Sequence, residues 1–372
     1  MEMPRTRVAI IGPVIPYRGG IAQHTTMLHR ALSRQSNCLT VSFTRQYPKI
    51  LFPGATDVDE SLVGHKEPGV EFLIDSINPL TWQKAIKRLL GFQPQVIIFP
   101  WWHVYWAPCF GWMASRLKRL LPGAELVFLC HNSLEHESAT WKRLLSNNVL
   151  SMATRFLVHT KEDRKNLRQW FPEKAVDVQF MPVFDNFPVP LGKLPRRKGL
   201  ELLFFGFVRP YKGLSTLLEA MALLKSENVH LTIVGEFWNG AGETNAFVHS
   251  HGLDGQVEVV ARYVPDAEAA EYFARCDLVV LPYHSATGSA VIPSAYHFNK
   301  PVLATKVGGL PDVVVDGETG TLVEPCSSDA LAHAIRSILV GEMHFNLERI
   351  ARFKAELSWD GFASAVLGGE RA

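Results

Sequence analysis

Arg209 and Lys212 form a basic pair on a short turn that also holds Pro210 and Gly213. The pair follows an apolar segment and precedes a segment of helical periodicity, so both side chains are expected near a helix N-terminus. A guanidinium and an ammonium group in that place can neutralise the two negative charges of a diphosphate. The alternative is an ordinary solvated surface, but the position after a predicted strand favours anion binding.

Small residues follow other predicted strands in the same way. They lack a side chain or carry a short hydroxyl, so their backbone amides are left free to bind an anion. The candidates are Gly19, Gly20, Thr287, Gly288 and Ser289, and the pair Gly308 and Gly309 repeats the pattern. Gly19 and Gly20 do not belong to a GxGxxG sequence, and a tight turn between strand and helix is the alternative interpretation.

His131 follows the apolar segment "VFLC" directly. At the end of a strand it could act near neutral pH as an acid, a base or a hydrogen-bond donor. The alternative is the start of a helix, because Asn132 and Ser133 are suitable N-cap residues. His24, His136 and His159 are lesser candidates, and the absence of an HExxH or Cys/His spacing predicts no metal site.

The composition is that of a globular protein large enough for two domains. The chain has 372 residues, of which 47% are hydrophobic, and carries 38 basic and 36 acidic residues. This balance gives no general attraction to nucleic acid, and no apolar run approaches the roughly 18 residues of a membrane span. The five cysteines show no CxxC spacing and fit a reducing compartment. We therefore expect a cytoplasmic protein and leave open a peripheral contact at the inner face of the membrane.

Short apolar runs alternate with amphipathic runs in two series, which is typical of parallel sheets. The first series has predicted strands at 7–13, 39–43, 94–100, 124–132 and 154–160 and helices at 22–34 and 80–90. The second has strands at 199–208, 229–236, 256–263, 276–283, 300–307 and 319–325 and helices at 213–227, 266–276 and 328–339. A proline-rich stretch separates the series. The prediction is an α/β protein of two doubly wound domains that face a central cleft.

Several of these segments together resemble the retaining GT-B glycosyltransferases of family 4. The segments are "RGGIAQH", "CHN", "FGFVRPYKGLSTLLEAM", "TIVGE", "CDLVVLPY" and "NKPVLATKVGGLPDVVVDGETGTLVEP". The resemblance implies an acceptor-side domain over 1–187, a linker over 188–198 and a nucleotide-sugar-binding domain over 199–355. It also implies that residues 356–372 form a helix that crosses back to the first domain.

The resemblance implies roles for individual residues. It places Gly20, Arg209 and Lys212 at the diphosphate of the donor, and His131 beside the transferred sugar. Arg262 and Tyr263 match the segment that contacts the nucleotide base.

The chain departs from the family pattern at two places. Phe207 occupies the usual position of the diphosphate arginine, and Arg209 comes two residues later. The paired glutamates of the E-x7-E motif are replaced by Ala286 and Ser294. We keep Ser294 among the predicted donor-binding residues, together with Thr287 and Ser289, whose hydroxyls can donate to phosphate oxygens.

An aromatic stretch at 99–123 is the predicted acceptor region. It contains Trp101, Trp102, Tyr105, Trp106 and Trp112, followed by a basic cluster. Such rings stack on sugars and occupy membrane interfaces, but they also fill cores. His103, with Trp102 beside it, is the predicted acceptor contact.

The predicted function is sugar transfer, with retention, from a nucleotide diphosphate sugar to a hydroxyl of a glycan or lipid-linked glycan, without a further cofactor. The alternative is a binding protein that kept the fold and lost turnover with its paired glutamates. A nucleotide-sugar epimerase would need carboxylates that we do not find, and a dinucleotide oxidoreductase would need the GxGxxG loop.

Overall fold

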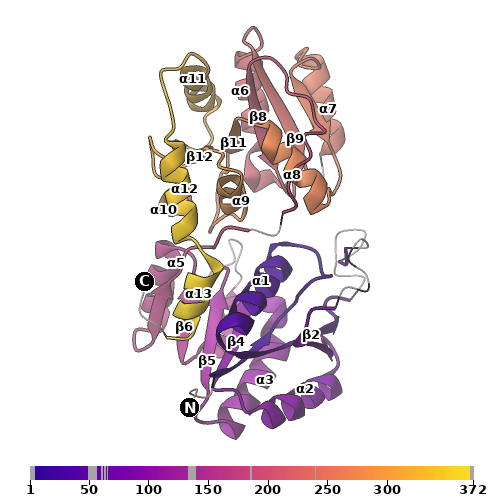
Figure 1. Ribbon diagram of the computed structural model, residues 1–372, viewed down its shortest axis with the longest axis vertical. Coiled ribbons are helices and arrows are strands. Elements are labelled where there is room, and N and C mark those ends of the chain that lie inside the picture. Colours follow the sequence, from indigo (N-terminus) through magenta and orange to yellow (C-terminus); the bar gives the residue numbers. More distant parts are fainter. Residues whose placement is uncertain are drawn as a thin grey trace. The chain divides into compact units, whose positions relative to one another are not determined.

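The computed structural model describes residues 5–48, 57–59, 62, 64, 66–132, 140–184, 187–238 and 240–368, and the chain divides into two compact units (Figure 1). Unit 1 comprises Met1–Phe180 and Trp359–Ala372, and unit 2 comprises Met181–Ser358. The division therefore falls before the predicted linker at 188–198. Each unit contains one parallel sheet, and helices connect most successive strands, so the α/β class and the doubly wound arrangement are confirmed.

Unit 1 is built on a seven-stranded sheet in the order β3-β2-β1-β4-β5-β6-β7. The strands are β1 Arg7–Ile11, β2 Asn37–Arg45, β3 Val70–Asp75, β4 Val96–Trp101, β5 Glu125–Cys130, β6 Arg155–Val158 and β7 Ala175–Val178. The helices are α1 Gly20–Gln35, α2 Pro79–Phe92, α3 Ala107–Leu120, α4 Thr140–Leu150 and α5 Lys161–Trp170, with a 3-10 turn at Val104–Trp106. The central strand β4 is buried along its whole length because helices cover both faces of a doubly wound sheet.

The C-terminal helix α13, Trp359–Val366, belongs to unit 1 and packs on α1. The yellow α13 lies beside the indigo α1 in Figure 1, and the Trp359 ring is 4.9 Å from the His24 ring. Arg34 at the end of α1 forms an ion pair of 2.6 Å with Asp360. The last helix thus covers the first helix of the chain.

Unit 2 is built on a six-stranded sheet in the order β10-β9-β8-β11-β12-β13. Its strands are β8 Leu200–Phe205, β9 Val229–Val234, β10 Val257–Val260, β11 Leu278–Leu281, β12 Val302–Thr305 and β13 Gly320–Val323. Its helices are α6 Leu214–Leu223, α7 Ala241–Ser250, α8 Asp266–Arg275, α9 Val291–His297, α10 Leu310–Val313, α11 Ser328–Leu339 and α12 Leu347–Glu356, with a 3-10 turn at Pro210–Lys212. β8 pairs with both β9 and β11, so the direction of winding reverses beside it.

Within the described part of the chain, no helix is both long enough and apolar enough to cross a membrane.

Candidate functional site

The reversal of winding in unit 2 brings two loops together at the carboxyl edge of its sheet. One loop follows β8 and the other follows β11, the neighbour of β8. In open parallel sheets this switch point is where ligands bind, because the loops of adjacent strands diverge there. The predicted basic pair lies on the first loop, and Thr287, Gly288 and Ser289 lie on the second.

The loop after β8 directs Arg209 onto an aromatic ring. Arg209 is the N-cap of the 3-10 turn, and its guanidinium carbon lies 3.4 Å from the centre of the Trp238 ring. A guanidinium stacked in this way keeps its hydrogen-bond donors at its edge and loses less freedom on binding a phosphate. Trp238 follows β9, and the sequence analysis did not identify it.

Lys212 is packed between the same loop and the loop after β11. Its Nζ lies 5.5 Å from the centre of the Tyr283 ring, and a Cβ built on Gly206 would be 3.1 Å from this Nζ. Burial, with a smaller contribution from the charge of Arg209, lowers the pKa of Lys212 to about 8. Within the described residues neither Arg209 nor Lys212 forms an ion pair with a carboxylate. Two cations without counter-charges favour an anionic ligand.

Close backbone contacts hold the two loops in register. Gly213 has φ +67, and a Cβ at this position would lie 1.9 Å from the carbonyl oxygen of Pro282. The backbone amide of His284 donates to the carbonyl of Tyr211 at 2.7 Å. The His284 ring shares a hydrogen bond of 2.9 Å with the Thr216 hydroxyl on α6. The position of Lys212 is therefore fixed by the loop after β11 as well as by its own turn.

The loop after β12 supports the segment that holds Thr287. Gly308 has φ +50, and a Cβ there would lie 1.6 Å from the carbonyl oxygen of Ala286. The backbone amide of Gly309 donates to the carbonyl of Thr287 at 3.1 Å. Gly308 thus admits the neighbouring loop closely, and the backbone amide of Gly309 is engaged by that loop. Anion binding by the glycine pair stays a prediction.

The hydroxyls of this segment differ in what they contact. Ser289 accepts from the backbone amide of Val291 at 3.2 Å, at the start of α9, and its hydroxyl also lies 3.2 Å from that of Tyr283. Ser294 is buried in α9 and donates to the carbonyl of Ala290 at 2.9 Å. Ser289 therefore contacts Tyr283, whose ring lies near Lys212. The Ser294 hydroxyl is hydrogen-bonded to a backbone carbonyl of the preceding turn. Ala286 is buried, and its side chain carries no polar group.

Arg262 and Tyr263 lie after β10, at the outer edge of the sheet. Arg262 is exposed and pairs with both carboxylate oxygens of Glu268 on α8, at 2.5 and 2.9 Å. Within the described residues, the hydrogen bonds of Arg262 go to Glu268 and to the carbonyl of Tyr263 and not to the basic pair. Their predicted contact with the base stays a prediction.

In unit 1 the predicted residues lie at the ends of β1 and β5. Gly19, with φ +104, is the N-cap of α1, and Gly20 begins that helix. His131 follows β5, and its Nδ1 is 3.1 Å from Nε2 of His159, whose Nδ1 is 2.9 Å from the carbonyl of Gln179. His131 thus belongs to a hydrogen-bonded pair with His159, which the sequence ranked as a lesser candidate. His136 lies outside the described residues.

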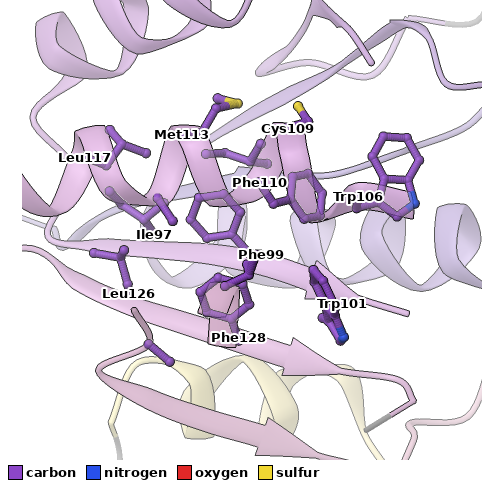
Figure 2. Packing of buried hydrophobic residues seen from close by; sticks show 14 of the residues in the cluster. Ile97, Phe99, Trp101, Trp106, Cys109, Phe110, Met113, Leu117, Leu126 and Phe128 are labelled. Carbon is purple, nitrogen blue, oxygen red and sulfur yellow. The ribbon is translucent and has the colours of Figure 1, made fainter. Parts of the chain in front are cut away.

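Most of the aromatic stretch at 99–123 belongs to the core of unit 1. Figure 2 shows Trp101 and Trp106 packed among residues of β4, β5 and α3, and both tryptophans are buried. Trp102 is half-buried and donates from Nε1 to the Tyr47 hydroxyl at 3.2 Å. His103 is exposed, and its Nδ1 accepts from the backbone amide of Tyr105 at 3.1 Å. Core packing is therefore the correct interpretation for Trp101 and Trp106. An acceptor platform could include only the more exposed residues of the stretch, such as Trp102 and His103.

Two family models match the chain, one in each unit. The model described as Glycosyltransferase Family 4 matches residues 18–182, and the model described as Glycosyl transferases group 1 matches residues 192–355. D-inositol 3-phosphate glycosyltransferase from Segniliparus rotundus is 30% identical over 289 residues, which cover 70% of this chain and 64% of that protein. The same enzyme from Arthrobacter is 35% identical over 144 residues, 37% of this chain and 32% of that protein. The chain thus matches from about a third to just under two thirds of these curated relatives.

Solved structures share the fold over nearly the whole chain. Sucrose-phosphate synthase from Thermosynechococcus elongatus superposes with a TM-score of 0.75 at 20% identity, covering 98% of each chain. Anabaena HepE, solved in complex with UDP-glucose, gives a TM-score of 0.67 at 18% identity, covering 97% of this chain and 99% of that one.

Proposed function

The chain belongs to the family 4 glycosyltransferases with the GT-B fold, and from this premise we propose that it transfers a sugar from a nucleotide diphosphate sugar to an acceptor hydroxyl. The observation that carries the proposal is the pair of cations, Arg209 and Lys212, which lies at the switch point of the unit 2 sheet and has no carboxylate partner among the described residues. UDP and UDP-glucose, which bind to the structural neighbour HepE, are the first donors to consider.

Arg209 and Lys212 would act on the leaving group. As the bond between the anomeric carbon and the phosphate oxygen breaks, negative charge grows on the diphosphate. Two fixed cations in a partly buried site stabilise this charge more than water does. Each is worth about 1.5–3 kcal/mol, the range for hydrogen bonds to charged groups.

We further propose that the transfer retains the anomeric configuration. The acceptor oxygen would bond to the anomeric carbon on the face from which the diphosphate departs, and the acceptor proton would pass to a phosphate oxygen. This route needs no protein nucleophile, which suits a donor site where Ala286 and Ser294 replace the family glutamates. Stabilising the leaving group is then the main task of the protein.

The absence of the two E-x7-E glutamates also leaves open the alternative that the protein binds the donor without turning it over. A ribose-clamping glutamate contributes about 1–3 kcal/mol when it accepts hydrogen bonds, so its absence weakens donor affinity without removing the phosphate site. A protein that only binds would still use Arg209 and Lys212. Donor binding without release of nucleotide diphosphate would support this alternative.

The proposed role of His131 in orienting the sugar rests on the family resemblance. Its Nδ1 is engaged by His159, and its Nε2 is buried without a partner among the described residues. The backbone at the end of β5 and the exposed His103 at the end of β4 are the parts of unit 1 through which we propose sugar or acceptor contact.

We propose that a lipid-linked acceptor is reached through peripheral contact of α4 and α5 with an anionic membrane. On α4 the side chains of Trp141, Leu144 and Leu145 are 59%, 72% and 42% exposed. α5 lies next to it, since Arg143 stacks at 5.1 Å on Trp170. An open hollow of about 580 Å³ on α5 is lined by Lys161, Arg164, Lys165, Arg168 and Gln169. Apolar side chains beside such a basic surface fit an anionic bilayer interface.

Donor turnover tests the proposal. The purified chain is incubated with UDP-, GDP-, ADP- and TDP-sugars, with and without glycan and lipid-linked acceptors, and the released nucleotide diphosphate is measured. We expect one donor to be consumed, faster with acceptor, and proton NMR of the first product to show the donor's anomeric configuration. Inverted product would contradict retention. Tight binding without release in every mixture would contradict transferase activity.

A further inference from the structure

Three histidines from separate elements of unit 1 meet in its interior. His24 comes from the second turn of α1, His131 from the end of β5 and His159 from the end of β6. One ring nitrogen from each lies within 4.8 Å of one from each of the others. The ring centres are 4.6, 5.1 and 4.9 Å apart for the pairs 24–131, 24–159 and 131–159.

The hydrogen bonds around this cluster leave several nitrogens unsatisfied. Both ring nitrogens of His24 and Nε2 of His131 are buried without a hydrogen-bond partner among the described residues, and His24 is 0% exposed. An unpaired buried polar atom costs about 1–3 kcal/mol. A ligand that interacts with an imidazole lone pair would satisfy one of the two His24 nitrogens.

The surroundings give the rings the form that a metal requires. His159 bonds through Nδ1 to the carbonyl of Gln179, which is the usual outer contact of a metal-binding histidine and directs Nε2 inward. Neutral imidazole is the ligand form of histidine.

We propose that His24, His131 and His159 bind one divalent transition-metal ion, for which Zn²⁺ is the best fit. Three imidazole nitrogens without a thiolate or carboxylate suit zinc and its neighbours rather than Mg²⁺ or Ca²⁺. Zinc–nitrogen bonds of about 2.0–2.1 Å in tetrahedral geometry place two ligand nitrogens about 3.3 Å apart. Nδ1 of His131 and Nε2 of His159, 3.1 Å apart, share a hydrogen bond in this structure, and the ion would take the place of that bond. A water molecule takes the fourth position.

The ion would connect α1 to the two strand ends beneath the C-terminal helix. Trp359 and Phe362 of α13 place their rings 4.9 and 5.4 Å from the ring of His24 and cover it. The site lies in unit 1, whereas the proposed diphosphate site lies in unit 2. His131 is also the residue proposed to orient the sugar, so the ion would share this residue with the proposed transferase site, but binding of the ion can be measured without any sugar donor.

Metal content and the Co²⁺ spectrum test this proposal. The full chain, without a histidine tag, is stripped with a chelator and titrated with Zn²⁺, and separately with Co²⁺. We expect about one equivalent of Zn²⁺ to bind, the melting temperature to rise, and Co²⁺ to give the intense visible bands of a tetrahedral site. Less than about a tenth of an equivalent, or a Co²⁺ spectrum of the hydrated ion, would overturn the site.

Variants of the histidines test whether these residues are the ligands of the ion. His24→Phe and His159→Phe keep a ring of similar size without a ligand atom, and each should weaken Zn²⁺ binding at least about 100-fold. His249, which is 86% exposed in unit 2, supplies the control His249→Phe, which should bind as the wild type does. Circular dichroism confirms that each variant is folded. If a phenylalanine variant proves unfolded, His159→Gln is tested instead. Unchanged Zn²⁺ affinity in a folded cluster variant would contradict the assignment.

Discussion

At the scale of single residues, the chemistry depends on a lysine that is easily deprotonated. Burial lowers the pKa of Lys212 to about 8, so the free protein holds its ammonium form below that pH and loses it above. A bound diphosphate favours the ammonium form and raises the pKa again. Donor affinity should therefore be highest below about pH 8 and fall as pH rises beyond it.

This linkage predicts proton uptake on binding. Near pH 8, calorimetry in buffers of different ionisation enthalpy should show protons taken up as the donor binds, because part of the free protein lacks the Lys212 proton. The variant Lys212→Met removes the titrating group and should abolish the uptake while weakening binding. Uptake that persists in this variant would assign the proton to another group.

Arg209 gives a second residue-scale prediction, because Trp238 holds its guanidinium. Trp238→Ala should lower donor affinity about two- to tenfold, the order of a cation–π contact. Trp141→Ala, an exposed tryptophan in unit 1, should leave donor affinity unchanged. Equal affinity in the wild type and Trp238→Ala would show that the stacking does not prepare Arg209 for the ligand.

At the scale of elements, the site depends on loops that approach closely through glycine. Gly308→Ala would place a Cβ 1.6 Å from the carbonyl of Ala286 in a left-handed backbone conformation. We expect a loss of at least about 2 kcal/mol in the free energy of unfolding and weaker donor binding. Gly255→Ala, where the Cβ meets nothing within 4 Å and φ is not positive, is the control. Similar melting temperatures for the two variants would contradict this account.

The sequence predicted the elements with continuous apolar runs and missed two edge strands. β4, β8 and β11 stood out because both faces of these strands are covered by helices. β3 and β7 were missed because they end the unit 1 sheet and are only partly buried, so polar residues interrupt them.

Only part of the candidate site could be predicted from the sequence. Arg209 and Lys212 could be predicted because they follow the first strand of a series. Trp238 and Tyr283 could not, because their contacts join loops whose proximity depends on strand order. His24 and His159 stand alone in the sequence, and only the fold of unit 1 brings them to His131.

At the scale of the whole molecule, unit 1 carries the exposed apolar side chains of α4, and unit 2 carries the proposed diphosphate site. The exposed apolar side chains of α4 predict that the protein binds membranes. Trp141→Ala combined with Leu144→Ser should reduce co-sedimentation with anionic vesicles by at least about tenfold, because each buried apolar side chain contributes about 1.5–3 kcal/mol. Leu223→Ser, on an exposed leucine of unit 2, is the control. Wild-type protein that stays in the supernatant at low salt would contradict the membrane contact.

The central claim is that Arg209 and Lys212 form the diphosphate site, and calorimetric titration of the folded chain with UDP and the other nucleoside diphosphates tests it most directly. We predict that one nucleotide binds the wild type and that Arg209→Ala and Lys212→Ala each weaken it about 10- to 100-fold, as expected for lost hydrogen bonds to a charged group. Undiminished affinity in both variants, or no binding of any nucleoside diphosphate to the wild type, would contradict the account.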